Sequence, residues 1–324
     1  MCAMSKLLVL SNFPLPELRP RHVEQIAACA AGFCEVVVTD QPERQRAEIA
    51  DSEIALGTVR RELFLAARRL RWVQAVGAGI DPMLFPEFIE SDVILTSEKG
   101  LVGTHLAEHA FALLLGLTRG LQRALREPRW ETRFAIRAHA WELDGLTLCI
   151  VGLGGTGLAV AERARAFGMR VLAVDPEPLE QPPSVECLAT PDRLGELLEQ
   201  SDVVVICAPL TPDTRHLFSA ERFAQMKPGS ILIDVTRGEI IERAPLVAAL
   251  RSGHLGGAGL DTSPGEPLSA EDPLWRMESV IITPHVAGAS PRRGDRIVEL
   301  FCENLRRFQA GESLRGVIDK RKGY

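Results

Sequence analysis

The sequence predicts an α/β protein made of two doubly wound domains, each built on a parallel β-sheet. Three observations lead to this fold class. Short runs rich in valine, leucine and isoleucine recur throughout the 324 residues, helix-like segments separate them, and the runs are apolar on both strand faces. Strands of that kind belong to parallel sheets that helices cover on both sides. A chain of this length suits two domains of ordinary size.

The expected strands fall into two groups, before and after a helical middle. The first group comprises residues 6–11, 35–40, 53–57 and 71–79. Residues 103–125 have apolar side chains at helical spacing and predict one long helix between the domains. The second group comprises residues 147–154, 170–175, 202–210, 230–238, 256–264 and 280–285. A last helix is expected over residues 290–312, after a Ser-Pro pair, and would return the chain to the first domain.

The composition argues against several kinds of partner. The formal net charge is -6, so the chain offers no basic face for nucleic acid or anionic lipid. The seven cysteines include no C-x-x-C pair, which is typical of a reducing cytoplasm. The first residues have too few apolar side chains for a signal peptide, and no run reaches the length of a membrane span. The sequence therefore predicts a cytoplasmic protein with no nucleic-acid or membrane partner.

A glycine-rich turn follows the expected strand that begins at residue 147. Gly152, Gly154 and Gly157 fill the pattern G-x-G-x-x-G, and a helix-like segment follows them. In this context the glycines allow a tight turn and a close approach of the backbone to a pyrophosphate. The N-terminus of the helix would direct free N–H groups at the same phosphates. The motif predicts a dinucleotide site; a plain strand–turn–helix unit without a ligand is the alternative.

Asp175 ends the next expected strand and bears on the choice of cofactor. A carboxylate there accepts hydrogen bonds from the adenosine ribose hydroxyls and repels a 2′-phosphate. Pro176 and Glu177 follow, so no arginine stands directly beside it to bind that phosphate. NAD is therefore the expected cofactor, and NADP is disfavoured.

Three polar residues follow apolar runs of the second group: Arg237, Glu266 and His285. Ligands of doubly wound folds bind beyond the carboxyl ends of the strands, which makes these side chains candidate catalytic residues. Histidine can protonate the alkoxide that forms when a ketone receives a hydride, and a glutamate on its other ring nitrogen would orient the ring. An arginine can grip a carboxylate and polarise the neighbouring carbonyl. The set suits a 2-oxo acid and its 2-hydroxy acid, although each residue alone also fits an ordinary structural role.

Blocks of sequence around these residues resemble one known family. They include "VGAGID" from residue 76, "HLAEHAFALLL" from 105, "MKPGSILIDVTRGEII" from 226, "AGLDTSPGEPL" from 258 and "TPHVAG" from 283. Their order and spacing are similar to those of the D-isomer-specific 2-hydroxyacid dehydrogenases. The resemblance implies a Rossmann NAD-binding domain, residues 102–286, inserted into a flavodoxin-like substrate domain, residues 1–101 and 287–324. It implies hydride transfer between NAD(H) and a small 2-oxo acid or D-2-hydroxy acid.

The same resemblance implies roles for individual residues. His285 would be the acid/base, Glu266 its partner, and Arg237 the group that binds the substrate's carboxylate and carbonyl. Backbone amides of Ala78 and Gly79 would hold the substrate carboxylate together with Arg237 and His285. The implied cofactor contacts are Thr104, Gly152, Gly154, Gly155, Thr156, Gly157, Asp175, Cys207, Ala208, Pro209, Thr214, Thr236, Arg237, Asp261, His285 and Gly288, with Asp261 orienting the nicotinamide carboxamide. A homodimer is also implied, formed through residues 103–125 and the following segment with Trp130 and Trp141.

Three departures from the family's usual residues bear on this site. Asp234 stands where asparagine is usual, Thr262-Ser263 where a larger apolar pair is usual, and Gly155-Thr156 where arginine and isoleucine are common. The first and last leave the expected mechanism intact, because backbone N–H groups bind the phosphates. Thr262 and Ser263 remove bulk near the glutamate, so the identity of the 2-oxo acid is not inherited from any relative.

Other interpretations account for parts of the same sequence. His105 and His109 in "HLAEH" match a zinc-peptidase pattern, but no third ligand is apparent and no metal is expected. A dehydrogenase-like protein that senses NAD(H), such as a corepressor, could carry the same three polar residues. So could an enzyme that oxidises a small oxyanion such as phosphite. Turnover of any 2-oxo acid would separate these alternatives.

Overall fold

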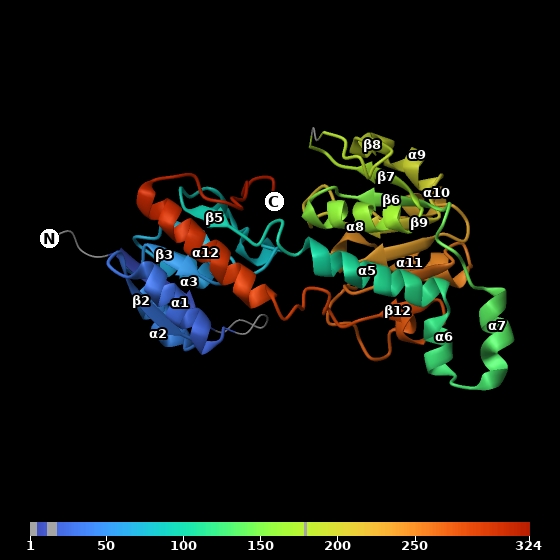
Figure 1. Ribbon diagram of the computed structural model, residues 1–324, viewed down its shortest axis with the longest axis horizontal. Helices are drawn as coiled ribbons and strands as arrows, with labels where there is room; N and C mark the ends of the chain where they lie inside the picture. The colour runs from blue at the N-terminus through green and yellow to red at the C-terminus, as the bar shows by residue number, and fades with distance from the viewer. Residues whose placement is uncertain (1–4, 12–17, 178–179) are drawn as a thin grey trace. The chain divides into compact units, whose positions relative to one another are not determined.

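The computed structural model describes residues 5–11, 18–177 and 180–324. It divides into two compact units, Met1–Val102 with Ala289–Tyr324, and Gly103–Gly288 (Figure 1). The second unit is inserted in the sequence of the first. Each unit contains one sheet, and the named strands of both sheets pair in parallel. The predicted fold class, two doubly wound parallel-sheet domains with one inserted in the other, is confirmed.

The sheet of the first unit has five strands in the order β2-β1-β3-β4-β5. Its strands are β1 (Ser5–Leu10), β2 (Cys34–Thr39), β3 (Ile54–Leu56), β4 (Trp72–Gln74) and β5 (Ile94–Thr96). The helices of this unit are α1 (Pro20–Ala30), α2 (Pro42–Ile49), α3 (Arg61–Ala66), α4 (Pro86–Ile89) and α12 (Arg293–Ala310), with the 3-10 turn η1 (Asp81–Met83). The strand order is that of flavodoxin-like folds.

The C-terminal helix α12 covers part of the first sheet. Its Phe301 and Phe308 stack on Trp72 of β4, with ring centroids 5.2 and 5.5 Å from the indole. α12 also packs against α1. Trp72 and Phe301 are fully buried, and burial of such a side chain contributes roughly 1.5–3 kcal/mol. The last helix is therefore an integral part of the core of the first unit.

The sheet of the second unit has seven strands in the order β12-β11-β10-β9-β6-β7-β8. They are β6 (Thr147–Val151), β7 (Arg170–Val174), β8 (Cys187–Ala189), β9 (Val203–Ile206), β10 (Ile231–Asp234), β11 (Gly257–Leu260) and β12 (Val280–Ile282). The helices are α5 (Gly103–Thr118), α6 (Leu121–Arg126), α7 (Arg133–Ala138), α8 (Gly155–Ala166), α9 (Leu194–Leu198), α10 (Ala220–Gln225) and α11 (Arg243–Arg251), with 3-10 turns η2 (Trp130–Thr132), η3 (Pro191–Arg193), η4 (Gly238–Ile240) and η5 (Pro273–Arg276). The chain order reverses between β6 and β9, where Rossmann folds bind a dinucleotide.

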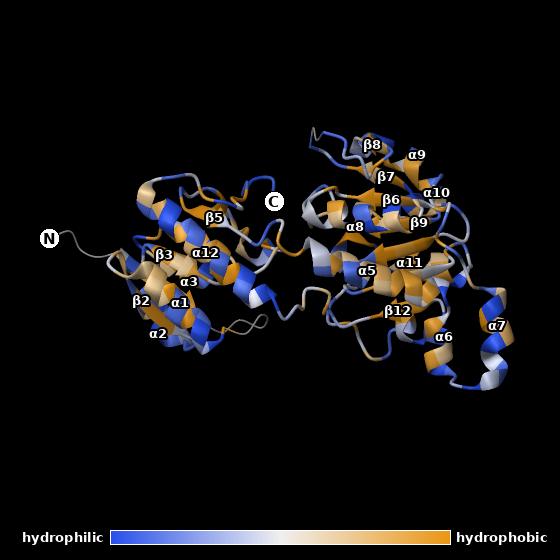
Figure 2. Cartoon of the chain, viewed as in Figure 1, coloured by the Kyte–Doolittle hydropathy of each residue, from blue (hydrophilic) through white to orange (hydrophobic). Residues whose placement is uncertain are grey.

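Successive residues of β6 face two different helical layers. Leu148 and Ile150 pack in one apolar cluster with side chains of α5 and α8. Cys149 and Val151 pack in a second cluster with side chains of α9, α10 and α11. Figure 2 shows the apolar strands of this sheet between helices of mixed polarity. Helices thus cover both faces, which leaves the strand ends as the places where polar side chains can gather.

The structure differs from the sequence-based prediction at two short strands and one helix. β5 and β8, of three residues each, were not predicted. The single helix predicted over residues 103–125 is broken: α5 ends at Thr118 and α6 begins at Leu121. Gly120 lies between them with a left-handed φ of 67°, a conformation that glycine adopts without steric cost and that ends helices.

Candidate active site

The carboxyl ends of β10, β11 and β12 meet at one edge of the second sheet. These strands are parallel neighbours in the order β12-β11-β10. Arg237 follows β10, Glu266 lies in the loop after β11, and His285 follows β12. Since parallel strands end at the same edge, three polar residues from separate segments lie in neighbouring loops.

His285 and Glu266 contact each other directly. The Nδ1 atom of His285 lies 2.9 Å from Oε2 of Glu266, and Oε1 of Glu266 accepts a hydrogen bond of 2.9 Å from the backbone N–H of Ser263. A carboxylate only accepts hydrogen bonds, so Nδ1 of the ring carries the hydrogen. Nε2 is left to exchange a proton with a ligand. The side chains of His285 and Glu266 are 51% and 36% exposed, so both reach solvent. The pair can hold an imidazole in one orientation and move a proton at Nε2.

Arg237 is held close to the loop that carries Glu266. The residue after it, Gly238, packs so tightly that a Cβ there would collide with the backbone of Ser263. Ser263 is the residue whose N–H binds the Glu266 carboxylate. The half-buried Arg237 side chain donates from Nη1 to the backbone oxygen of Thr236 at 2.8 Å. The backbone beside Arg237 therefore packs against the loop of the carboxylate–imidazole pair.

Asp234 lies fully buried at the end of β10 and fastens the turn before Arg237. Its Oδ1 accepts hydrogen bonds from the N–H and the hydroxyl of Thr236 at 2.9 and 2.8 Å, and its Oδ2 accepts one from the hydroxyl of Thr262 at 2.7 Å. Burial raises the pKa of Asp234 to about 6, although the hydrogen bonds and the charge of Arg237 act in the opposite direction. The carboxylate therefore joins the ends of β10 and β11 beneath the candidate site.

Asp261 forms a second buried anchor, directly after β11. Its carboxylate accepts hydrogen bonds from the hydroxyl of Thr283 at 2.6 Å and from the backbone N–H groups of Val286 and Ala287 at 2.9 and 2.8 Å. The Nε2 atom of His109, on α5, lies 3.3 Å away. Burial acts to raise the pKa of Asp261, but the hydrogen bonds from His109, Thr283 and the two amides outweigh it and hold the pKa below its ordinary value. Sequence analysis singled out Asp261 but not the supporting roles of His109 and Thr283.

The glycine-rich turn lies after β6, at the same sheet edge. A Cβ on Gly157 would collide with the backbone oxygen of Gly152, whereas a Cβ on Gly154 would meet no atom within 4 Å. The turn is therefore closely packed on one side and open beside Gly154, at the N-terminus of α8. Asp175 accepts a hydrogen bond of 2.7 Å from the N–H of Leu153, which holds the carboxylate against the turn. An open backbone beside a helix N-terminus with an adjacent acid fits the phosphates and ribose of a dinucleotide.

The other residues that the resemblance implies as cofactor contacts also lie in the second unit. Thr104 opens α5 beside Gly103, which abuts the backbone of Gly155 in the glycine-rich turn. Cys207, Ala208 and Pro209 follow β9, Thr214 donates a hydrogen bond of 2.7 Å to the oxygen of Pro209, and Thr236 and Gly288 follow β10 and β12. Ala78 and Gly79 belong to the first unit, in the loop after β4.

The HLAEH segment forms part of α5 and supplies His109 to the Asp261 anchor. Among the residues that the structure describes, no group of three or more His, Cys, Asp or Glu side chains is arranged to hold a metal ion. Across those same residues, no helix combines the length and the apolar character needed to cross a membrane.

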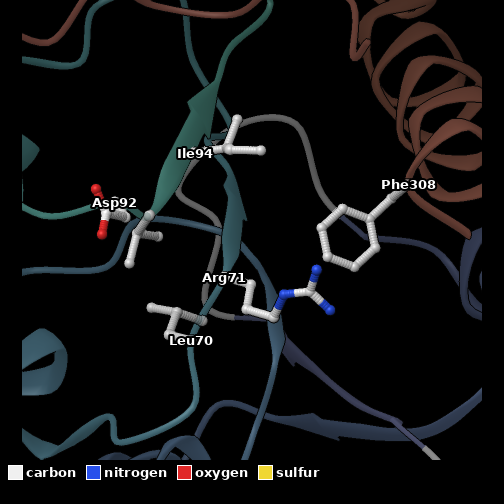
Figure 3. Close-up of a pocket in the computed structure, with 6 residues that line it drawn as sticks. Leu70, Arg71, Asp92, Ile94 and Phe308 are labelled. Carbon is white, nitrogen blue, oxygen red and sulfur yellow. The ribbon is translucent and has the colours of Figure 1, made fainter. Parts of the chain in front are cut away.

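A hollow of about 420 Å³ lies on the first unit, at the amino ends of β4 and β5. Leu70, Arg71, Asp92, Val93, Ile94 and Phe308 line it (Figure 3). The guanidinium of Arg71 lies 5.0 Å from the ring centroid of Phe308 and 3.6 Å from Oε2 of Glu53. This hollow lies at the edge of the first sheet opposite the carboxyl ends of its strands, and the guanidinium of Arg71 already has partners.

Comparison with known proteins identifies the family. Residues 111–287 match the model of the D-isomer specific 2-hydroxyacid dehydrogenase NAD binding domain. The chain is 35% identical to a glyoxylate reductase of Korarchaeum cryptofilum over 277 residues, 83% of this chain and 82% of the relative. This chain belongs to the D-isomer-specific 2-hydroxyacid dehydrogenase family. The family predicted from the sequence is confirmed, and so is the prediction of an oxidoreductase with a nicotinamide cofactor.

Two further family members show the breadth of the match. An (S)-sulfolactate dehydrogenase of Chromohalobacter salexigens is 38% identical over 254 residues, 77% of this chain and 81% of the relative. The crystal structure of a D-isomer specific 2-hydroxyacid dehydrogenase from Xanthobacter autotrophicus, in complex with NADPH and MES, superposes with a TM-score of 0.84 at 28% identity. That comparison covers 99% of this chain and 100% of the other, so both units share the family fold.

Proposed function

We propose that this protein transfers a hydride between NAD(H) and a small 2-oxo acid or D-2-hydroxy acid, with His285 as the acid/base. The observation that carries the proposal is the 2.9 Å contact between His285 Nδ1 and Glu266 Oε2, at the sheet edge where the glycine-rich turn also lies. An imidazole fixed by a carboxylate, with an arginine in a loop at the same sheet edge, supplies the groups that reduction of a 2-oxo acid requires.

The chain's own groups would handle the substrate's charge and its proton. When bound, the nicotinamide supplies or accepts the hydride at the substrate's second carbon. Arg237 binds the substrate carboxylate and polarises the carbonyl. The Nε2–H of His285 gives its proton to the carbonyl oxygen as the C–H bond forms, and Glu266 stabilises the imidazolium before transfer. In the oxidative direction, neutral Nε2 takes the hydroxyl proton.

The two units would have different roles. Residues 103–288 supply the glycine-rich turn, Asp175 and the acid/base pair, and act as the NAD-binding domain. The family resemblance also implies that the backbone amides of Ala78 and Gly79 bind the substrate carboxylate. Supporting this division, the family model that covers residues 111–287 describes an NAD binding domain.

NAD rather than NADP is the proposed cofactor, and Asp175 is the reason. Its carboxylate is held beside the glycine-rich turn by the N–H of Leu153, where it would meet the ribose hydroxyls and repel a 2′-phosphate. The Xanthobacter relative was crystallised with NADPH, so membership of the family does not by itself decide the cofactor. Comparison of kcat/KM with NADH and with NADPH tests the proposal, and a preference for NADPH would overturn it.

The decisive assay offers glyoxylate, hydroxypyruvate, pyruvate and longer 2-oxo acids with NADH and follows loss of NADH absorbance. At least one acid should be reduced, and His285→Ala should lower its kcat by roughly 100-fold. His254→Ala, which removes a histidine bonded to the backbone oxygen of Phe223, is the control and should keep normal turnover. NADH binding without turnover of any 2-oxo acid would favour an NAD(H)-sensing protein, and turnover of phosphite with NAD would favour oxyanion oxidation.

A further inference from the structure

The turn that presents His285 is anchored to the buried residue Asp261. His285 has a left-handed φ of 54°, a conformation that side-chain-bearing residues adopt only when their surroundings enforce it. The N–H of His285 donates to the backbone oxygen of Asp261 at 2.9 Å, and the next two amides, of Val286 and Ala287, donate to its carboxylate. Three consecutive N–H groups therefore point at Asp261, and the position of this residue decides where the imidazole stands.

A chain of polar groups from α5 reaches the same carboxylate. The Thr283 hydroxyl has one hydrogen, and at 2.6 Å from Oδ1 of Asp261 it donates that hydrogen to the carboxylate. The oxygen of Thr283 can then only accept from Nε2 of His109, which lies 2.8 Å away. His109 must therefore carry its hydrogen on Nε2. The direction of the chain is fixed: His109 donates to Thr283, and Thr283 donates to Asp261.

The location of His109 suits a support for this turn. It lies on the sixteen-residue helix α5, which packs closely on β11 and β12: a Cβ on Gly259 would meet Leu113, and one on Gly116 would meet Ile281. The helix is thus a rigid base from which a side chain can reach the strand ends. The Asp261 side chain is 1% exposed, and His109 brings a basic group to this buried carboxylate.

We infer that His109 is a positioning residue, which acts through Thr283 and Asp261 to hold the turn that presents His285. This inference rests on the proposed function for its effect on catalysis, because His285 is the group being positioned. The hydrogen-bond chain consists only of the protein's own residues. Its effect on the turn can therefore be measured without cofactor or substrate.

The first experiment measures hydrogen–deuterium exchange of the unliganded protein at the amides of residues 286 and 287. His109→Leu removes the Nε2 donor, and Thr283→Val removes the relaying hydroxyl at nearly constant shape. Each should speed exchange at these two amides by roughly tenfold. His109→Gln, whose amide nitrogen can occupy the place of Nε2, should stay within about twofold of the wild type. His254→Leu loses a comparable Nε2 contact elsewhere in the unit and should change nothing at these amides.

The second experiment measures steady-state kinetics with the best 2-oxo acid. A mispositioned acid slows the chemical step, so kcat should fall by roughly tenfold in His109→Leu while KM for the 2-oxo acid stays within about twofold. His109→Gln should recover most of the loss. The double variant with Thr283→Val should be no slower than the worse single variant, because both side chains act through one carboxylate.

Three results would overturn the inference. One is unchanged exchange at residues 286 and 287 in both His109→Leu and Thr283→Val. Another is a uniform increase in the exchange rate of amides across the unit, β6 included, which would show a general loss of stability. The third is a normal kcat in His109→Leu although exchange at these amides is faster, which would show that loosening the turn does not slow catalysis. If no 2-oxo acid is reduced at all, the proposed function fails while the exchange measurement still decides whether His109 holds the turn.

Discussion

Asp234 and Thr262, which the family resemblance marks as departures from the usual residues, are joined by a hydrogen bond of 2.7 Å. The carboxylate replaces an amide, and the threonine hydroxyl supplies a donor that an apolar side chain would lack. Together with Thr236 this gives the buried carboxylate three donors, and the charge of Arg237 also acts on it. Burial still dominates, so the pKa of Asp234 is raised to about 6.

The raised pKa predicts a specific dependence of stability on pH. The folded state binds the Asp234 proton more tightly than the unfolded chain, whose carboxyl has a pKa near 3.8. Stability from this group is therefore complete below pH 3.8 and is lost as the pH rises to about 6, by about 3 kcal/mol in all. Asp234→Asn removes the titration, so its unfolding temperature should exceed that of the wild type by several degrees at pH 7.5 and by less at pH 4.5.

Thermal unfolding of both proteins across this pH range provides the measurement. Asp192→Asn, at an exposed position, is the control and should follow the wild type at every pH. A constant difference between wild type and Asp234→Asn from pH 4.5 to 7.5 would contradict a carboxyl that titrates in the folded state.

At the scale of elements, substitutions in the turn between β6 and α8 can distinguish an effect on protein stability from an effect on cofactor binding. Gly157→Ala would press a methyl group against the backbone oxygen of Gly152, so it should lower both the unfolding temperature and the affinity for NADH. Gly154→Ala meets no protein atom within 4 Å, so the unliganded protein should keep its stability. The methyl would instead occupy the place where the pyrophosphate approaches, and the Kd for NADH should rise by roughly tenfold or more.

Calorimetric titration with NADH and thermal unfolding of the unliganded variants measure the two effects independently. Equal NADH affinity in Gly154→Ala and the wild type would mean that the dinucleotide does not approach this turn. A large loss of stability in Gly154→Ala would show that the open side of the turn is occupied by the protein itself.

The elements that the sequence predicted well are those with local signals. Long apolar runs predicted β6, β9 and β10, and the rule that ligands bind at carboxyl strand ends led to Arg237, Glu266 and His285 before any contact was known. The three-residue strands β5 and β8 were missed, although β3, β4 and β12 are equally short and were predicted. The positions of His109 and Thr262 depend on how α5 crosses β12 and how β11 lies beside β10. Such packing across distant segments leaves no local pattern in the sequence.

At the scale of the whole molecule, α6, η2 and α7 form an arm that extends from the sheet of the second unit (Figure 1). Its apolar side chains are unusually exposed: Leu125 by 81%, Trp130 by 77% and Phe134 by 63%. Trp141, which follows the arm, packs against the core of the unit instead. Exposed large apolar residues gathered on one projecting segment indicate a surface that associates with another protein chain, and the homodimer implied by the family resemblance would cover it.

The exposed apolar arm therefore predicts a dimer, and charged substitutions in the arm should dissociate it. Leu125→Glu combined with Trp130→Glu would place two carboxylates in an apolar interface, and their desolvation should convert a dimeric wild type to a monomer at micromolar concentration. Light scattering after gel filtration measures the mass of each species. Leu65→Glu, at an exposed leucine of α3 in the first unit, is the matched control and should remain dimeric. A monomeric wild type, or a double variant that stays dimeric, would show that the arm does not join two copies of this chain.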